Sequence, residues 1–346
     1  MTVTTSPPPT LPGAAAPAGQ GYFHAHRGDL AHRLRGALPR ADLKRLHARS
    51  GGRHALIALR QAALYGLGWW ALVSCDEPWI WLPVAAFQGA VILSFIILLH
   101  DVVHECVFRH RRPTAARRLG RLYALPSGIS SSQFTRWHLD HHKELGSADR
   151  DPKRAHLSPR RNARWLKLAY MTPALFVIYA RAAAAALHEY PPGLRRVIRL
   201  ERLANVALHL AVLVTLVAFL GWEVALRAHV LPLFVFFPVA FTVNRLGQHY
   251  WIDATDPAKW GTRVDGNPLI GFVFLNSHLH LEHHYFPAVP LYRLPTLNRA
   301  MRPFWEAIDH PSRTYRELLW GWLVQNREAH TDWDRQPSEV PAAPAA

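Results

Sequence analysis

The sequence has few cysteines and few acidic residues. Its 346 residues include two cysteines, Cys75 and Cys106, which excludes a disulfide framework and a cysteine-based zinc or iron–sulfur site. Asp and Glu number 24 against 40 Lys and Arg, so the formal net charge is +16. Such a balance is typical of nucleic-acid-binding proteins or of membrane proteins with basic cytoplasmic faces. The position of the charges decides between these two classes.

Long apolar stretches are missing from both ends of the chain. Residues 1–21 lack the basic start and apolar core of a signal peptide, and their richness in Pro, Ala, Gly and Thr predicts a disordered tail. Residues 331–346 have a similar composition and predict a second disordered tail. Residues 22–54 are polar and basic with scattered leucines, which predicts a solvated, amphipathic segment on a membrane surface.

Charge is nearly absent from four apolar runs. The run at 79–99 has no charged residue, and at about 1.5 Å per residue it spans the roughly 30 Å hydrocarbon layer. A buried core helix is the alternative for any single run, but four runs in two close pairs favour a membrane. We therefore predict an all-α integral membrane protein with four transmembrane helices in two hairpins. The expected spans are residues 55–74, 79–99, 203–222 and 229–247.

Basic residues gather on one side of the four runs. Eight Lys or Arg fall in 22–54, none falls in the loop at 75–78, and the middle segment 100–202 is strongly basic. The positive-inside rule assigns these segments, and with them both termini, to the cytoplasm. Cationic faces beside anionic lipid headgroups explain the charge, so no nucleic-acid partner is expected. The membrane domain is predicted at 55–310, followed by a cytoplasmic C-terminal helix at 311–330.

One further apolar stretch, 168–187, is long enough to compete as a fifth span. Pro173 and Arg181 interrupt it. An odd number of spans would also place the histidine groups described next on opposite sides of the membrane. We expect this stretch to lie in the interface plane or to pack under the cytoplasmic part.

Histidine, in contrast, is abundant and grouped. The groups are "HDVVH" (100–104), "WHLDHH" (137–142), "GQHYW" (247–251) and "HLEHH" (280–284). Residues three and four apart share a helix face, so a group of this spacing directs two or three imidazoles to one point. All four groups fall on the predicted cytoplasmic side, where a helical cap would hold them. All-imidazole sites suit Zn, Cu, Fe or Ni, and eight or more ligands favour two metals over one tetrahedral zinc.

Acidic residues stand within the same groups. Carboxylates beside metal ligands often accept the imidazole N–H, which fixes the tautomer and raises ligand basicity. We expect this role for Asp101, Asp140 and Glu282, with plain solvation as the alternative interpretation.

Four apolar runs in two pairs, with "HDVVH", "HLDHH" and "HLEHHYFP" in this order, resemble the membrane fatty acid desaturase superfamily. The resemblance covers roughly residues 55–310. It implies two non-haem irons with O2 as co-substrate, held by the three histidine boxes and by one more histidine after the last span, which His249 supplies. The implied ligands are His100, His104, His138, His141, His142, His249, His280, His283 and His284.

Three features depart from the superfamily pattern or add to it. Some members have an asparagine four residues before the additional histidine, where this chain has Arg245, and Asn244 stands one position earlier. His110 and His278 are surplus to the implied ligand set. No "HPGG" motif is present, so a fused cytochrome b5 domain is not expected. Electrons are instead expected from a separate ferredoxin or cytochrome b5-like protein with its reductase.

The resemblance implies oxidation of an unactivated C–H bond in a fatty acyl or related lipid chain. Loss of a second hydrogen would give an alkene, and addition of oxygen would give an alcohol. The ligand pattern leaves open a hydroxylase or ketolase acting on a lipid, carotenoid or alkane. A membrane metal transporter or sensor is a more distant alternative, because transporters usually place ionisable ligands near the bilayer midplane.

Overall fold

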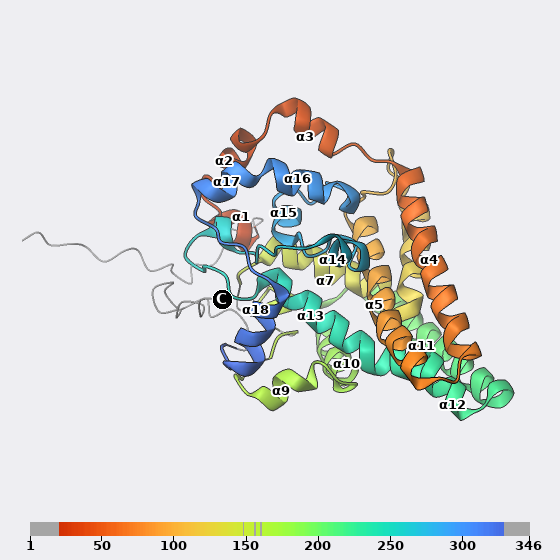
Figure 1. Cartoon of the computed structure of the whole chain (residues 1–346). Coiled ribbons are helices and arrows are strands. Elements are labelled where there is room, and N and C mark those ends of the chain that lie inside the picture. Colours follow the sequence, from red (N-terminus) through yellow and green to blue (C-terminus); the bar gives the residue numbers. More distant parts are fainter. Residues whose placement is uncertain (1–20, 148, 156, 160, 329–346) are drawn as a thin grey trace, which may run out of the picture.

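The computed structural model describes residues 21–147, 149–155, 157–159 and 161–328. Within these ranges the regular structure is helical, apart from one isolated bridge between Val264 and Arg313. Except for Gly21, the predicted tails at 1–21 and 331–346 lie outside the described residues. Figure 1 shows the long helices together on one side of the molecule and most of the short helices on the other.

Four helical stretches are long and apolar enough to cross a membrane, which confirms the predicted all-α class. The fourth stretch, Trp222–His249, is made of α12, a π-helical segment at Leu226–Phe236, and α13. The long helices are α4 (Gly51–Ser74), α5 (Pro78–Val103), α11 (Pro192–Leu220), α12 (Trp222–Ala225) and α13 (Phe237–His249).

All four stretches begin earlier than the sequence predicted, and the difference is largest for the last two. Helix α11 starts at Pro192 instead of residue 203, since the charged residues before the apolar run continue the same helix, and proline is well suited to a first helical position. It ends before Gly221, whose φ of 84° breaks the helix. The fourth stretch starts at Trp222 instead of residue 229. Its Pro232 has no N–H to donate and lies in the π-helical segment, where the hydrogen-bond spacing is widened.

Helix α5 is the central helix of the membrane part. Leu98 and Leu99 are buried in the largest core cluster, which α4, α6 and α13 also join. An added Cβ on Gly89 would lie 2.6 Å from the Cβ of Phe236, so this glycine permits the close approach of the π-helical segment. Helices α4 and α11 instead present apolar side chains outward, for example Trp70 (65% exposed) and Phe219 (82% exposed). Such faces are expected where a helix contacts lipid.

The segment 22–54 differs from the expected solvated helix. It forms α1 (Tyr22–His26), α2 (Leu30–Ala37) and α3 (Arg40–Leu46). Leu30, Leu34 and Leu46 are buried in a cluster with Leu281 and other residues of the C-terminal part. Because Leu281 belongs to the histidine group at 280–284, these short helices pack against that histidine group.

The remaining apolar and C-terminal stretches form short helices. Pro173 caps α10 (Ala174–Ala186) and separates it from α9 (Arg164–Ala169), so neither helix is long enough for a fifth span. The expected helix at 311–330 is shorter in the structure: α18 (Tyr315–Leu319) continues as a π-helix to Val324. Residues 329 and 330 lie outside the described part. The other α-helices are α6 (Pro113–Ala124), α7 (Ser131–Glu144), α8 (Pro152–Ala155), α14 (Pro268–Val273), α15 (His280–Tyr285), α16 (Leu294–Ala300) and α17 (Arg302–Ala307).

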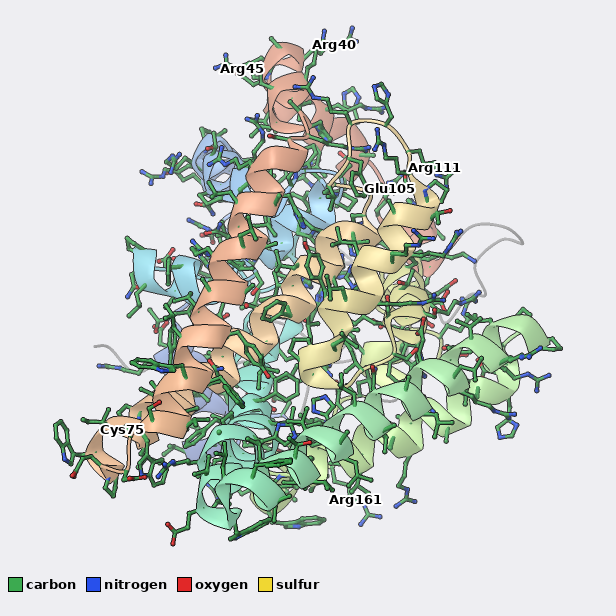
Figure 2. All side chains as sticks on the ribbon, turned by 90° about the vertical axis from the view of Figure 1, so that its right-hand side faces the viewer. Arg40, Arg45, Cys75, Glu105, Arg111 and Arg161 are labelled. Carbon is green, nitrogen blue, oxygen red and sulfur yellow. The ribbon has the colours of Figure 1, made fainter. Side chains whose placement is uncertain are left out.

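Figure 2 views the molecule from the side on which α4 lies in Figure 1. Cys75, in the loop after α4, lies at one end of this helix, whereas Arg40 and Arg45 lie beyond its other end. Glu105 and Arg111, which follow the first histidine group, lie toward the same end as Arg40 and Arg45. The first histidine group and the basic N-terminal segment therefore lie toward one end of the molecule, opposite the loop at Cys75.

Candidate metal centre

The end of α5 fixes the first pair of histidines. His100 lies in the last turn of α5, and His104 caps the helix. Glu105 adopts a left-handed conformation (φ 55°), and the N–H groups of Glu105 and Cys106 donate to the carbonyls of Val102 (3.1 Å) and Asp101 (2.9 Å). This is the Schellman pattern of a helix C-terminus. It holds the imidazoles of His100 and His104 on one face, with ring centroids 5.0 Å apart.

The start of α7 fixes the second group. Ser130 caps the helix by accepting from the N–H of Gln133 (3.1 Å). Glu201 of α11 accepts from the Ser130 hydroxyl (2.7 Å) and from the N–H of Ser132 (2.9 Å). A carboxylate at a helix N-terminus is favourable because of the helix dipole. These bonds hold α7 against α11, and His138, His141 and His142 lie further along α7.

The structure gathers all nine predicted histidines into two clusters. His249 comes from the last turn of α13, and α15 provides the histidines of the group at 280–284. Within each cluster the nearest ring nitrogens all lie within 4.8 Å of one another. The first cluster is His100, His104, His138, His142 and His283. The second cluster is His141, His249, His280 and His284.

The spacing of the Nε2 atoms fits metal coordination. Neighbouring Nε2 atoms are 2.7–3.0 Å apart in the first cluster. They are 2.9–3.2 Å apart in the second. Two imidazole nitrogens bound at right angles to one ion, each about 2.1 Å from it, are about 3.0 Å apart. Each cluster therefore has the size of a coordination sphere around a single ion.

The tautomers of two histidines explain why a cation would be favourable between them. His141 Nδ1 donates to Asp151 Oδ1 (2.8 Å), and His249 Nδ1 donates to the carbonyl of Trp260 (2.7 Å). A neutral imidazole with its proton on Nδ1 carries a lone pair on Nε2. The two Nε2 atoms are 2.9 Å apart, so two lone pairs face each other without a proton between them. A bound metal ion converts this repulsion into attraction.

Burial keeps the clustered histidines neutral. It lowers the pKa of His104 to about 4. Burial and neighbouring histidines lower the pKa of His138 and His142 well below the ordinary value, and burial has the same effect on His280, with Lys153 as the next cause. Neutral imidazoles are the form that binds metals. The site is thus prepared to accept cations at neutral pH.

The structure corrects the role expected for the three carboxylates. Asp101 pairs with His54 Nδ1 (3.4 Å) and accepts from the N–H of Leu291 (3.2 Å). Asp140 pairs with Arg136 (2.6 Å), and Glu282 accepts from the amide of Asn298. None of these partners is one of the nine histidines. The geometric reason is that on a helix an acid next to a histidine projects from a different face than that histidine.

The supporting carboxylate is instead Asp151, which the sequence interpretation missed. It lies just before α8 and is 3% exposed. Besides His141 it accepts from the backbone N–H of Lys153 (2.9 Å). Its sequence context, "ADRDPKR", looks like a charged surface loop, and spacing along a helix does not link it to any histidine. Only the path of the loop back to α7 brings it to the ligand.

The surplus polar residues fall outside both clusters. His110 is exposed in the loop after α5, and His278 is buried but belongs to neither group. Asn244 exchanges a hydrogen bond with Ser277 (2.9 Å). Arg245 donates to the carbonyl of Leu157 (2.9 Å) and to the hydroxyl of Tyr179. Neither additional histidine therefore lies in one of the two clusters.

A cavity of about 440 Å³ reaches the histidines. Its wall includes His100, His138, His280 and His283, so both clusters border it. The part lined by residues 93–97 of α5 and by the start of α13 is apolar, with residues such as Ile97 and Phe237. A long apolar chain would fill this part and bring one of its carbons to the histidines.

The comparison with known proteins agrees with this site. The family model described as fatty acid desaturase matches residues 77–316, more than half of the chain. A sphingolipid delta(4)-desaturase, DES1, of Drosophila melanogaster is 28% identical over 69% of this chain and 72% of its own length. The sphingolipid delta(4)-desaturase/C4-monooxygenase DES2 of Homo sapiens is 25% identical over 75% of this chain and 77% of its own. The chain therefore belongs to the fatty acid desaturase family and is an oxidoreductase that acts on lipids by desaturation or hydroxylation.

Proposed function

We propose that this protein is an O2-dependent di-iron enzyme that introduces a carbon–carbon double bond into a long-chain lipid of the sphingolipid type. The observation that carries the metal part of the proposal is the pair of His141 and His249, whose lone pairs face each other at 2.9 Å. Five imidazoles in one cluster and four in the other are enough donors for two ions. The relatives named as sphingolipid desaturases support the substrate class.

The nine clustered histidines would hold the two irons, five imidazoles on one ion and four on the other. When bound, the iron pair supplies the capacity to use O2 for the removal of hydrogen from an unactivated C–H bond. Asp151 and the carbonyl of Trp260 hold His141 and His249 in the tautomer that binds metal. The chain itself then has to position the lipid carbon and keep water away.

The cavity supplies that positioning. Its apolar wall on α5 and α13 accepts the hydrocarbon chain, and His100 and His283 border the space where the reacting carbons would lie. Burying an apolar chain in such a cavity contributes about 0.8 kcal/mol per CH₂ group, which is ample to hold a long chain. Because this wall is mostly apolar, a bound chain would displace water from the apolar part of the cavity.

Hydroxylation is a second candidate outcome of the same site. It is favoured by the DES2 relatives, which are named desaturase/C4-monooxygenase in Bos taurus and in Homo sapiens. Desaturation removes a second hydrogen from the neighbouring carbon, whereas hydroxylation adds oxygen to the first. Which outcome occurs would depend on how close the second carbon is held to the metal centre. A product measurement distinguishes the two outcomes.

We also propose that the histidine clusters face the cytoplasm and that a separate electron donor serves them. The basic segment 22–54 and the first histidine group lie toward the same end of the molecule, opposite Cys75 (Figure 2). Basic segments stay on the cytoplasmic side of a membrane. The electron donor would be a ferredoxin or a cytochrome b5-like protein with its reductase, approaching from that side.

Expression of the chain in a host that makes saturated sphingoid lipids tests the proposed function. We expect mass spectrometry to find long-chain lipids that have lost two hydrogens, or gained one oxygen, only in cells that express the protein. A variant with His141 replaced by Ala serves as the matched control and should give neither product. Unchanged lipids in expressing cells that contain folded, iron-loaded protein and a suitable electron donor with its reductase would refute the substrate proposal.

A further inference from the structure

The cavity changes character along α13 as it approaches the histidines. Phe237 and Phe241 line its apolar part, and Arg245 and Gln248, one and two turns further along, line the part toward the C-terminal end of α13. These residues follow one another at helical spacing, so they form a single stripe of the helix that faces the cavity. The polar end of the stripe is therefore next to the proposed metal centre, and the apolar end is away from it.

Lys153 completes this polar end from a different segment of the chain. Its ammonium group donates to the side-chain oxygen of Gln248 (2.9 Å) and lies 3.4 Å from Nε2 of His280. It lines the cavity together with these residues. If His280 binds metal through Nε2, that nitrogen has no lone pair left for the lysine. The amino group of Lys153 then has spare donor capacity at the cavity wall, next to His280.

The basic side chains of this wall donate hydrogen bonds to neutral groups, and the Asp151 carboxylate also interacts electrostatically with Lys153. Arg245 donates to the carbonyl of Leu157 and to the hydroxyl of Tyr179, and Lys153 donates to the amide oxygen of Gln248. A guanidinium group has five N–H donors, and these contacts use only part of them. A half-buried basic group whose N–H donors are only partly used is favoured by a ligand that brings hydrogen-bond acceptors.

These contacts bear on where along the lipid the reaction occurs. If the polar group of a lipid binds a wall that touches the metal ligands, the carbons that react lie only a few bonds from this polar group. A reaction in the middle of a long chain would instead need an apolar wall beside the histidines and polar groups far from them. The cavity-lining residues of α13 match the first case, because the polar ones lie at the end of the helix near the histidines and the apolar ones lie away from it.

We propose that Lys153, Arg245 and Gln248 form a headgroup pocket that binds the hydroxyl and amide oxygens of an N-acyl amino alcohol lipid, and that this pocket directs oxidation to the carbons next to the headgroup. This inference rests on the proposed function, since it assumes that the histidine clusters oxidise the bound lipid. It assigns Arg245 and Lys153 as positioning residues that select both the lipid class and the position of reaction.

The same cavity has a second polar region, which provides the comparison. Arg202 of α11 and Gln133 of α7 are hydrogen-bonded to each other and also line the cavity. Gln133 precedes His138 by more than one turn of α7, so this region lies further from the histidines. A headgroup bound there would place carbons further down the chain at the metal centre.

The first experiment measures binding to the full-length protein in lipid nanodiscs without O2, so that no turnover occurs. The probes are a saturated N-acyl 2-amino-1,3-diol lipid and its analogue with both hydroxyl groups replaced by hydrogen. The wild type should bind the diol at least about tenfold more tightly than the analogue, as expected for hydrogen bonds to charged groups. Arg245→Met should reduce this preference about tenfold, whereas Arg202→Met should leave it within about twofold.

The second experiment measures the product. The wild type should place the double bond or hydroxyl group next to the carbons that carry the headgroup, and Arg245→Met should raise KM for the diol more than it lowers kcat. Equal binding of the two lipids by the wild type, which needs no variant to fold, would overturn the headgroup pocket. Loss of diol preference in Arg202→Met but not in Arg245→Met, or a product oxidised in the middle of the chain, would also overturn it. The last result would leave the proposed oxidase function intact, whereas absence of any oxidised lipid would refute that function instead.

Discussion

Replacement of His283 by alanine is expected to abolish lipid oxidation and to reduce bound iron from two ions to about one per chain. His283 belongs to the five-histidine cluster, with its Nε2 2.9 Å from that of His142, and it also borders the cavity. Removal of a group that merely supports a ligand typically costs 10–100-fold, so loss of the ligand itself should reduce turnover more than about 100-fold. Product analysis together with iron determination on the purified protein measures both effects.

His110 provides the matched control for this variant. It follows the first histidine group closely in sequence but is exposed and belongs to neither cluster. The His110→Ala variant should therefore keep two irons and wild-type turnover. Turnover close to the wild type in His283→Ala, or equal losses in the two variants, would contradict the assignment of the clusters as the metal centre.

Replacement of Asp151 by alanine is expected to weaken iron binding by the four-histidine cluster about 10–100-fold. The Asp151 carboxylate accepts from Nδ1 of His141 (2.8 Å), and both side chains are buried. Without this acceptor the ring loses its fixed tautomer and orientation, and its Nε2 is less basic. Titration with a chelator, followed by measurement of the iron that remains bound, should show one weakened ion and one unchanged ion.

Asp140 is the control for this second prediction, because it lies next to His141 in sequence but pairs with Arg136. The Asp140→Ala variant should retain iron within about twofold of the wild type, as is usual when a partly exposed ion pair is removed. If Asp140→Ala lost iron and Asp151→Ala did not, the acceptor role derived from the structure would be incorrect.

Much of the site was predictable because it depends on residues that are close together in the sequence. His138, His141 and His142 occupy one helix, and their spacing alone directs them to one side. The four apolar stretches are equally local, since length and lack of charge identify them. The division of the nine histidines into a group of five and a group of four was not predictable, because α7 contributes to both groups.

The features that the sequence did not predict depend on contacts between distant segments. Asp151 reaches His141 through the path of a loop, and Lys153 and Gln248, 95 residues apart, meet at the cavity. The three carboxylates expected to support the histidines were chosen by sequence proximity, and each one found a partner elsewhere. The leucines of segment 22–54 have a helical pattern that suits a membrane surface as well as a protein core. In the structure they pack into a core with the C-terminal part of the chain.

The central claim is that two irons lie within the two histidine clusters. Anomalous X-ray scattering at the iron absorption edge, from crystals of the iron-loaded protein, tests it most directly. We expect two peaks, one among the rings of His100, His104, His138, His142 and His283, and one among those of His141, His249, His280 and His284. A single peak, or a peak away from both clusters, would contradict it.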